Sequence, residues 1–154
     1  MSKVLIIDDE RSLLTTLELL FDSEGYEVLT AGDGREGVAL MERENPDLVI
    51  TDIRMPEMDG LQVLRHARKV DPYLPVVLIT AQADKEDAIR AVNEGAYYFL
   101  EKPFENPSLL KIAGEALEHG RAGRKFSERR RELKSHKGVE TPMGESTAIK
   151  QVLD

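Results

Sequence analysis

Val4-Leu5-Ile6-Ile7-Asp8-Asp9 places two carboxylates directly after four apolar residues near the start of the chain. Three further runs, mostly apolar, also end at polar residues: Leu48-Val49-Ile50-Thr51 before Asp52, Val76-Val77-Leu78-Ile79 before Thr80-Ala81, and Tyr97-Tyr98-Phe99-Leu100 before Glu101-Lys102-Pro103. Short apolar runs with many β-branched members are typical of strands buried on both faces of a parallel sheet. We therefore predict a parallel sheet with polar side chains at the carboxyl ends of its strands.

Helical patterns separate these strands, and Tyr26 to Thr30 adds one more short strand. The expected helices begin after Asp9, after Gly34, at Asp59 as a cap, at Ala83-Asp84 and near Pro107. In the fourth of them, Ala88, Ile89 and Val92 form the apolar pattern. Five strands that alternate with five helices predict an α/β fold, a doubly wound five-stranded parallel sheet with helices on both faces.

The chain has 154 residues, a net charge of −8 and no cysteine. Its length fits one domain with some excess, and no apolar run is long enough for a membrane span or a signal peptide. We therefore expect a cytoplasmic protein without a membrane segment. Residues 1–118 carry 12 basic against 24 acidic side chains, which argues against nucleic-acid binding there, whereas residues 119–138 carry 8 against 2. We interpret the basic stretch as a solvated helical linker.

The polar residues at the strand ends predict a site for a divalent cation and a phosphoryl group, because ligands of open parallel sheets bind at that edge. Asp8, Asp9 and Asp52 would form an oxygen-rich site suited to Mg²⁺. A carboxylate can also attack phosphorus as a nucleophile. Lys102 would neutralise charge on the transferring group, and the Thr80 hydroxyl could bond to a phosphoryl oxygen.

The chain resembles the receiver domain of two-component response regulators over residues 1–118. The matching elements are Asp8-Asp9, Asp52-Ile53-Arg54-Met55-Pro56-Glu57-Met58-Asp59-Gly60, Thr80-Ala81 and Lys102-Pro103-Phe104. The resemblance implies a flavodoxin-like fold and a switch rather than an enzyme. Such a switch is phosphorylated by a sensor histidine kinase.

The resemblance also assigns roles to single residues. It implies that Asp52 is the phosphoacceptor, that Asp9, Asp52 and the Arg54 carbonyl ligate Mg²⁺, and that Asp8 acts largely through water. It further implies that Lys102 pairs with the phosphoryl group and that the Lys102-Pro103 bond is cis. Thr80 and Phe99 occupy the family's switch positions, and Gln82 stands where hydrolysis is tuned.

The tail carries a second, shorter resemblance. Gly144-Glu145-Ser146 followed by Ala148-Ile149-Lys150-Gln151-Val152 is similar to the opening of the AAA+ ATPase domain in sigma-54-dependent transcription activators. This resemblance implies three parts: a receiver over 1–118, a basic linker over 119–138, and the start of a truncated ATPase over 139–154. DNA and sigma-54 RNA polymerase would then be reached only through domains outside this chain.

The last helix is expected to continue into the linker. Four good core residues and four polar or small residues alternate along it at intervals of three and four. They are Leu109, Ile112, Ala116, His119, Gly123, Phe126, Arg130 and Leu133. This heptad spacing predicts a coiled coil, and with it a homodimer joined through the extended helix and the adjacent receiver face. Gly120 and Gly123 weaken a helix, so the alternative is a monomer with a frayed linker beyond Gly120.

Two other functions fit parts of the pattern. A Mg²⁺-dependent phosphatase of the haloacid-dehalogenase type also uses a nucleophilic Asp, but it needs a second Asp two residues later, where this chain has Glu10 or Arg54. A flavodoxin-like nucleotide or flavin binder needs a Gly- or Ser/Thr-rich loop after the first strand. Asp8-Asp9-Glu10 would repel a phosphate there unless a cation intervened.

Overall fold

The computed structural model describes residues 2–82 and 84–137, with side chains described up to residue 125. The elements are β1 (Lys3–Ile7), α1 (Arg11–Ser23), β2 (Glu27–Ala31), α2 (Gly34–Glu44), β3 (Leu48–Asp52), α3 (Gly60–Val70), β4 (Val76–Thr80), α4 (Lys85–Asn93), β5 (Tyr98–Glu101) and α5 (Asn106–Lys137). The five strands form one sheet in the order β2-β1-β3-β4-β5, and all neighbouring strands are parallel. The predicted doubly wound α/β fold is confirmed.

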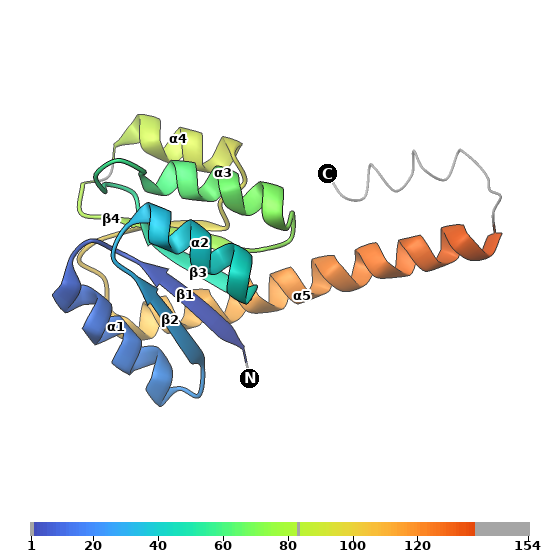
Figure 1. Cartoon of the computed structure of the whole chain (residues 1–154), viewed down its shortest axis with the longest axis horizontal. Coiled ribbons are helices and arrows are strands. Elements are labelled where there is room, and N and C mark those ends of the chain that lie inside the picture. Colours follow the sequence, from blue (N-terminus) through green and yellow to red (C-terminus); the bar gives the residue numbers. More distant parts are fainter. Residues whose placement is uncertain (1, 83, 138–154) are drawn as a thin grey trace. The chain divides into compact units, whose positions relative to one another are not determined.

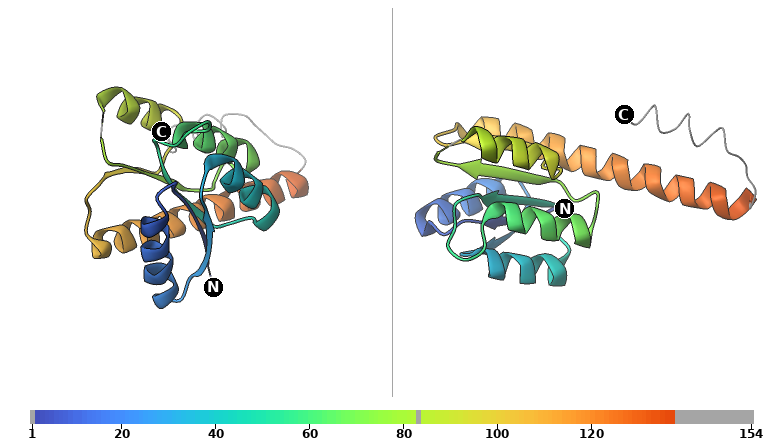
Figure 2. Two further views of the ribbon diagram at one scale, coloured as in Figure 1. Left: turned by 60° about the vertical axis from the view of Figure 1, so that its left-hand side comes forward. Right: turned by 90° about the horizontal axis from the view of Figure 1, so that it is seen from above.

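Two layers of helices cover the sheet (Figure 1). Helices α2, α3 and α4 lie over one face, and α1 and the first part of α5 lie over the other, as both views of Figure 2 also show. Each layer buries its own apolar cluster against alternate side chains of the strands, so Leu5 and Ile7 face one cluster and Val4 and Ile6 face the other. Within the described residues, no helix combines the length and the apolar character that crossing a membrane requires.

The prediction that the apolar runs are buried on both faces holds for the three central strands only. Strands β3 and β4 are buried along their whole length, and β1 is buried from Val4 onward. Strand β5 begins at Tyr98, not Tyr97, and its residues are exposed or half-buried. The reason is its place in the sheet, because β5 is an edge strand that pairs with β4 alone.

The loop between β3 and α3 packs tightly against the end of β3. Asp59 caps α3 as predicted, and with Gln62 it forms a reciprocal capping box. The Gly60 N–H donates to the Ile53 carbonyl at 2.9 Å. A Cβ at residue 60 would lie 2.4 Å from the Asp52 carbonyl oxygen, so only glycine fits there. Cap and glycine together fix the backbone that follows Asp52.

Helix α5 runs from Asn106 to Lys137, so the predicted continuation of the last helix is confirmed. The chain divides into two units after Arg121, and the first, Met1–Arg121, contains the whole sheet. Gly120, which the sequence marks as a weak point of the helix, lies in close contact with the loop before β4. A Cβ there would lie 3.0 Å from both Pro75 Cδ and the Tyr73 carbonyl oxygen. The predicted ATPase start, 139–154, lies outside the described residues, and the coiled coil stays a prediction.

Candidate functional site

The carboxyl ends of four strands bring the predicted site residues to one edge of the sheet. Asp8 and Asp9 directly follow β1, Asp52 is the last residue of β3, Thr80 is the last residue of β4, and Lys102 directly follows β5. Backbone hydrogen bonds fix these ends. The Ile53 N–H donates to the Ile79 carbonyl at 3.0 Å, and the Lys102 N–H donates to the Thr80 carbonyl at 2.8 Å. The parallel register therefore sets which side chains meet.

Three carboxylates converge at this edge. Asp8, Asp9 and Asp52 each offer one oxygen, and these oxygens all lie within 4.8 Å of one another. Asp8 and Asp52 are buried, whereas Asp9 is exposed. Carboxylate oxygens of this number suit a hard cation such as Mg²⁺, which takes few protein ligands and keeps water or phosphate oxygens in its remaining positions. The donor set therefore fits the ion that the sequence predicts.

A single ammonium group lies among these carboxylates. Lys102 Nζ donates to Asp8 Oδ2 at 3.3 Å and lies 3.5 Å from Asp52 Oδ2. Its side chain is only 18% exposed, so both ion pairs are largely shielded from water. The Lys102-Pro103 peptide bond is cis, as predicted. Lys102 thus presents one positive charge to two buried carboxylates.

Burial raises the pKa of both Asp8 and Asp52 above the usual value for aspartate. Backbone N–H groups oppose the shift: Glu10 N–H donates to Asp8 Oδ1 at 2.9 Å, and Arg54 N–H donates to Asp52 Oδ1 at 3.3 Å. The positive charge of Lys102 also lowers both pKa values, but it does not cancel the effect of burial. The ionised site is therefore short of positive charge, which a divalent cation would supply.

The two predicted switch residues lie on neighbouring strands. Thr80 is fully buried, and its hydroxyl donates to the Gln82 carbonyl at 3.1 Å and accepts from the Gln82 N–H at 3.2 Å. The Thr80 hydroxyl is thus hydrogen-bonded to the loop that directly follows β4. Phe99 pairs with Leu78 across β4 and β5 and packs half-buried against the cluster under α3 and α4. Their switching roles stay a prediction.

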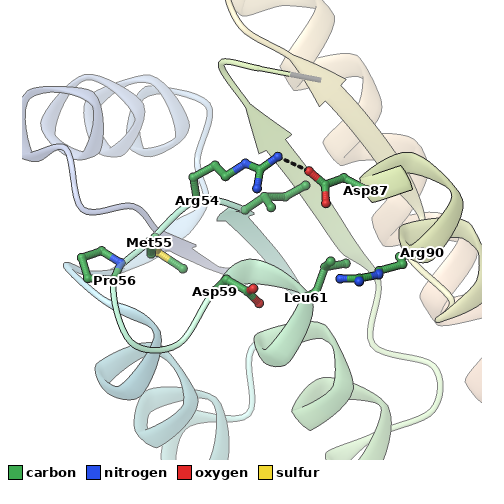
Figure 3. A pocket seen from close by; sticks show the side chains of 8 residues that line it. Arg54, Met55, Pro56, Asp59, Leu61, Asp87 and Arg90 are labelled. Carbon is green, nitrogen blue, oxygen red and sulfur yellow. Dashed lines mark hydrogen bonds and ion pairs between the residues drawn. The ribbon is translucent and has the colours of Figure 1, made fainter. Parts of the chain in front are cut away.

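The sequence predicts the Arg54 carbonyl as a metal ligand, but it does not predict what the Arg54 side chain does. The guanidinium Nη2 pairs with Asp87 Oδ2 of α4 and lies 3.8 Å from Asp84 Oδ2 (Figure 3). A pocket of about 360 Å³ lies beside this pair. Its lining comes from the β3–α3 loop, α3 and α4, and includes Ile53, Leu61 and Arg90.

The larger apolar residues of α4 do not form the face that packs on the domain. Ala88 is half-buried, while Ile89 and Val92 are 53% and 72% exposed. The buried residues are Asp87 and Ala91, one helical turn apart. A buried carboxylate whose partner lies 33 residues away leaves no local periodic signal, so the apolar pattern of this helix does not show which face is buried.

Strand order and the acidic edge together define a flavodoxin-like receiver fold. The chain belongs to the response regulator receiver domain family, and the sequence model of that family matches residues 4–113. A receiver domain protein from Clostridium thermocellum has a TM-score of 0.76 and 34% identity to it, over 79% of this chain and 98% of that one.

Curated relatives include transcription regulators of the sigma-54-dependent class. The chain is 44% identical over 115 residues to the transcriptional regulatory protein GlrR of Escherichia coli K12, which is 75% of this chain and 26% of that protein. It is 38% identical over 117 residues to the regulatory protein AtoC of the same strain, over 76% of this chain and 25% of that protein. The chain thus spans about a quarter of the length of these relatives.

Proposed function

We propose that this receiver domain is a phosphorylation switch whose phosphoacceptor is Asp52. An Asp52 carboxylate oxygen attacks the phosphorus of a phosphohistidine on a sensor histidine kinase. The new oxygen–phosphorus bond forms as the nitrogen–phosphorus bond breaks, and the leaving imidazole nitrogen takes up a proton. The product is an acyl phosphate on Asp52 and a free histidine on the kinase.

The residues around Asp52 would hold and neutralise the transferring group. Asp9, Asp52 and the Arg54 carbonyl are the proposed ligands of Mg²⁺, with Asp8 acting through water. When bound, the ion neutralises charge on the phosphoryl oxygens. Lys102 holds a second positive charge at the same edge, and Thr80 supplies a hydroxyl once it leaves Gln82.

One observation carries this proposal: a buried carboxylate at the end of a central strand has Lys102 Nζ 3.5 Å away and two further carboxylates within reach of one ion. The burial that raises the Asp52 pKa also limits the access of water to the acceptor. A cation would supply the positive charge that such an arrangement lacks, and with the cation bound the site could accept an anionic phosphoryl group.

The output of the switch would be the surface of α4, β5 and the first part of α5. Phosphorylation is proposed to draw Thr80 toward the phosphoryl oxygen, which frees space for Phe99 to turn inward. Ile89, Val92 and Tyr98 are exposed on that surface and would change their partners. In the whole protein, a cytoplasmic homodimer would pass the change to a sigma-54-activating ATPase and so to transcription.

The test is phosphorylation of residues 1–154 by acetyl phosphate, followed by mass spectrometry. We expect one added phosphoryl group with Mg²⁺ and none with a chelator. Asp52→Asn should abolish the addition, because an amide is a poor nucleophile and a poor metal ligand. Asp33→Asn is the matched control, since Asp33 caps α2 with its side chain and asparagine caps a helix equally well.

Labelling of Asp52→Asn at the level of the unchanged protein would remove Asp52 from the role. Turnover of phosphoesters would instead favour the phosphatase alternative.

Light scattering on residues 1–154 and on a truncation at Glu118 tests the homodimer, and a monomeric long form in both phosphorylation states would contradict it.

A further inference from the structure

Helix α4 is held to the domain by few apolar contacts. Ala91 is its only fully buried apolar side chain among the described residues, while Ile89 and Val92 face outward. For comparison, α3 buries Leu61, Val63, Leu64 and Ala67. Because burial of apolar surface provides most of the free energy that holds a helix in place, α4 depends on its polar contacts to an unusual degree.

The main polar contact of α4 is the ion pair between Asp87 and Arg54. Asp87 is 8% exposed, and burying a carboxylate is costly unless a cation is hydrogen-bonded to it. Arg54 Nη2 supplies it, and the same nitrogen lies 3.8 Å from Asp84 Oδ2, whose side chain caps the helix. Figure 3 shows the guanidinium reaching from the loop after β3 to the first turn of α4.

Arg54 also contacts the phosphoacceptor, through its backbone. Its N–H donates to Asp52 Oδ1 at 3.3 Å, so one residue binds Asp52 with its main chain and Asp87 with its side chain. Any group that takes over Asp52 Oδ1 removes the acceptor of this N–H. The loop that carries the guanidinium would then shift relative to α4.

We propose that the Arg54–Asp87 pair is a latch that holds α4 in its unmodified position, and that chemistry at Asp52 opens it through the Arg54 backbone. The coupling half of this inference rests on the proposed function. The latch half does not, because it concerns the unmodified protein alone. Opening the latch leaves Asp87 without its partner, and α4 then moves to expose that carboxylate to water.

Hydrogen exchange of the α4 amides tests the latch on residues 1–154. In the unmodified protein, Asp87→Asn should lower protection across α4 by about fivefold, because the neutral amide accepts a weaker hydrogen bond from Arg54 than the carboxylate does. Amides of α1, on the opposite face, should keep their protection. Glu86→Gln is the matched control, because Glu86 is exposed, lies in the same turn and undergoes the same change of charge.

A double-mutant cycle identifies the partner. Arg54→Gln should reproduce the loss, and adding it to Asp87→Asn should cause little further loss, since each change breaks the same pair. Full additivity, or unchanged protection in Asp87→Asn, would overturn the latch. Because asparagine is nearly isosteric with aspartate, the variant should fold, and retained α1 protection reports that it does.

Beryllofluoride with Mg²⁺ tests the coupling. In the unchanged protein it should lower α4 protection, whereas in Asp87→Asn protection is already low and should fall little further. A full beryllofluoride effect in Asp87→Asn would overturn the coupling. If beryllofluoride does not bind the unchanged protein, judged by the fluorine-19 signal of the complex, the proposed function and the coupling fail together, and the unmodified variants still decide the latch.

Discussion

Two buried carboxylates of this domain have different electrostatic surroundings. Asp52 shares one ammonium group with Asp8 and has the charge of Asp9 nearby, so negative charge exceeds positive charge. Asp87 pairs with the guanidinium of Arg54 on the other side of the β3–α3 loop. The Asp84 carboxylate lies further from the same guanidinium. The first arrangement suits a site that must gain a cation and a phosphoryl group. The second arrangement, at Asp87, suits a structural contact.

The largest expected effect is at Lys102. Lys102→Gln removes the ammonium group that lies 3.5 Å from Asp52 Oδ2 and should slow phosphorylation by acetyl phosphate by roughly 10²–10³-fold, as loss of one transition-state donor does. Lys111→Gln, an exposed position on α5, is the control and should leave the rate unchanged. A rate for Lys102→Gln within a factor of two of the original would show that the charge deficit at Asp52 does not matter for transfer.

The second prediction concerns the metal. Asp8→Asn should weaken Mg²⁺ binding by about 10–100-fold, the range found when a group that orients metal ligands is lost. Titration of Mg²⁺ followed by calorimetry measures it. Asp87→Asn should bind Mg²⁺ as the unchanged protein does, because its carboxylate lies outside the acidic cluster. Equal weakening in both variants would mean that the two carboxylates are not electrostatically distinct.

The third prediction is that two similar substitutions change stability in opposite directions. In Mg²⁺-free buffer at neutral pH, Asp52→Asn should raise the free energy of unfolding, because the ionised form of Asp52 is disfavoured by burial. Asp87→Asn should lower it by about 1 kcal/mol, the typical net value of a hydrogen bond, because the outer half of this pair is solvent-exposed. Urea denaturation measures both, and changes of the same sign would contradict the contrast.

The smallest expected effect is a pH dependence. Burial raises the pKa of Asp52 above 3.8 in the folded state, so the folded protein binds this proton more tightly than the unfolded chain does. The stabilising effect of protonation is complete below 3.8 and is lost as the pH rises through the folded pKa. In Mg²⁺-free buffer the stability advantage of Asp52→Asn should therefore be greatest near neutral pH and shrink on acidification. Melting curves over that range measure it, and an advantage that grew on acidification would reverse the assigned shift.

Sequence patterns predicted which polar side chains meet at the sheet edge, but they do not show how α4 packs. Asp8, Asp52, Thr80 and Lys102 follow from strand order alone, because parallel register brings the ends of neighbouring strands together. The apolar pattern of α4 does not show which face is buried, since the buried positions carry Asp87 and Ala91. An ion pair to a loop 33 residues earlier replaces apolar periodicity there, and no local pattern encodes such a partner.

The same limit applies to Gly120. Helix propensity alone treats a glycine within a helix as destabilising. The structure, however, places Pro75 Cδ and the Tyr73 carbonyl oxygen 3.0 Å from the position that a Cβ would take at residue 120.

That contact makes residue 120 a point of close approach between α5 and the loop before β4. With no side chain at residue 120, α5 lies close against the loop before β4. Movement of this part of α5 toward the loop before β4 would therefore bring the helix into contact with loop atoms over a short distance. A single added methyl group would lie 3.0 Å from the loop, and the loop would have to shift by a few tenths of an ångström to admit it.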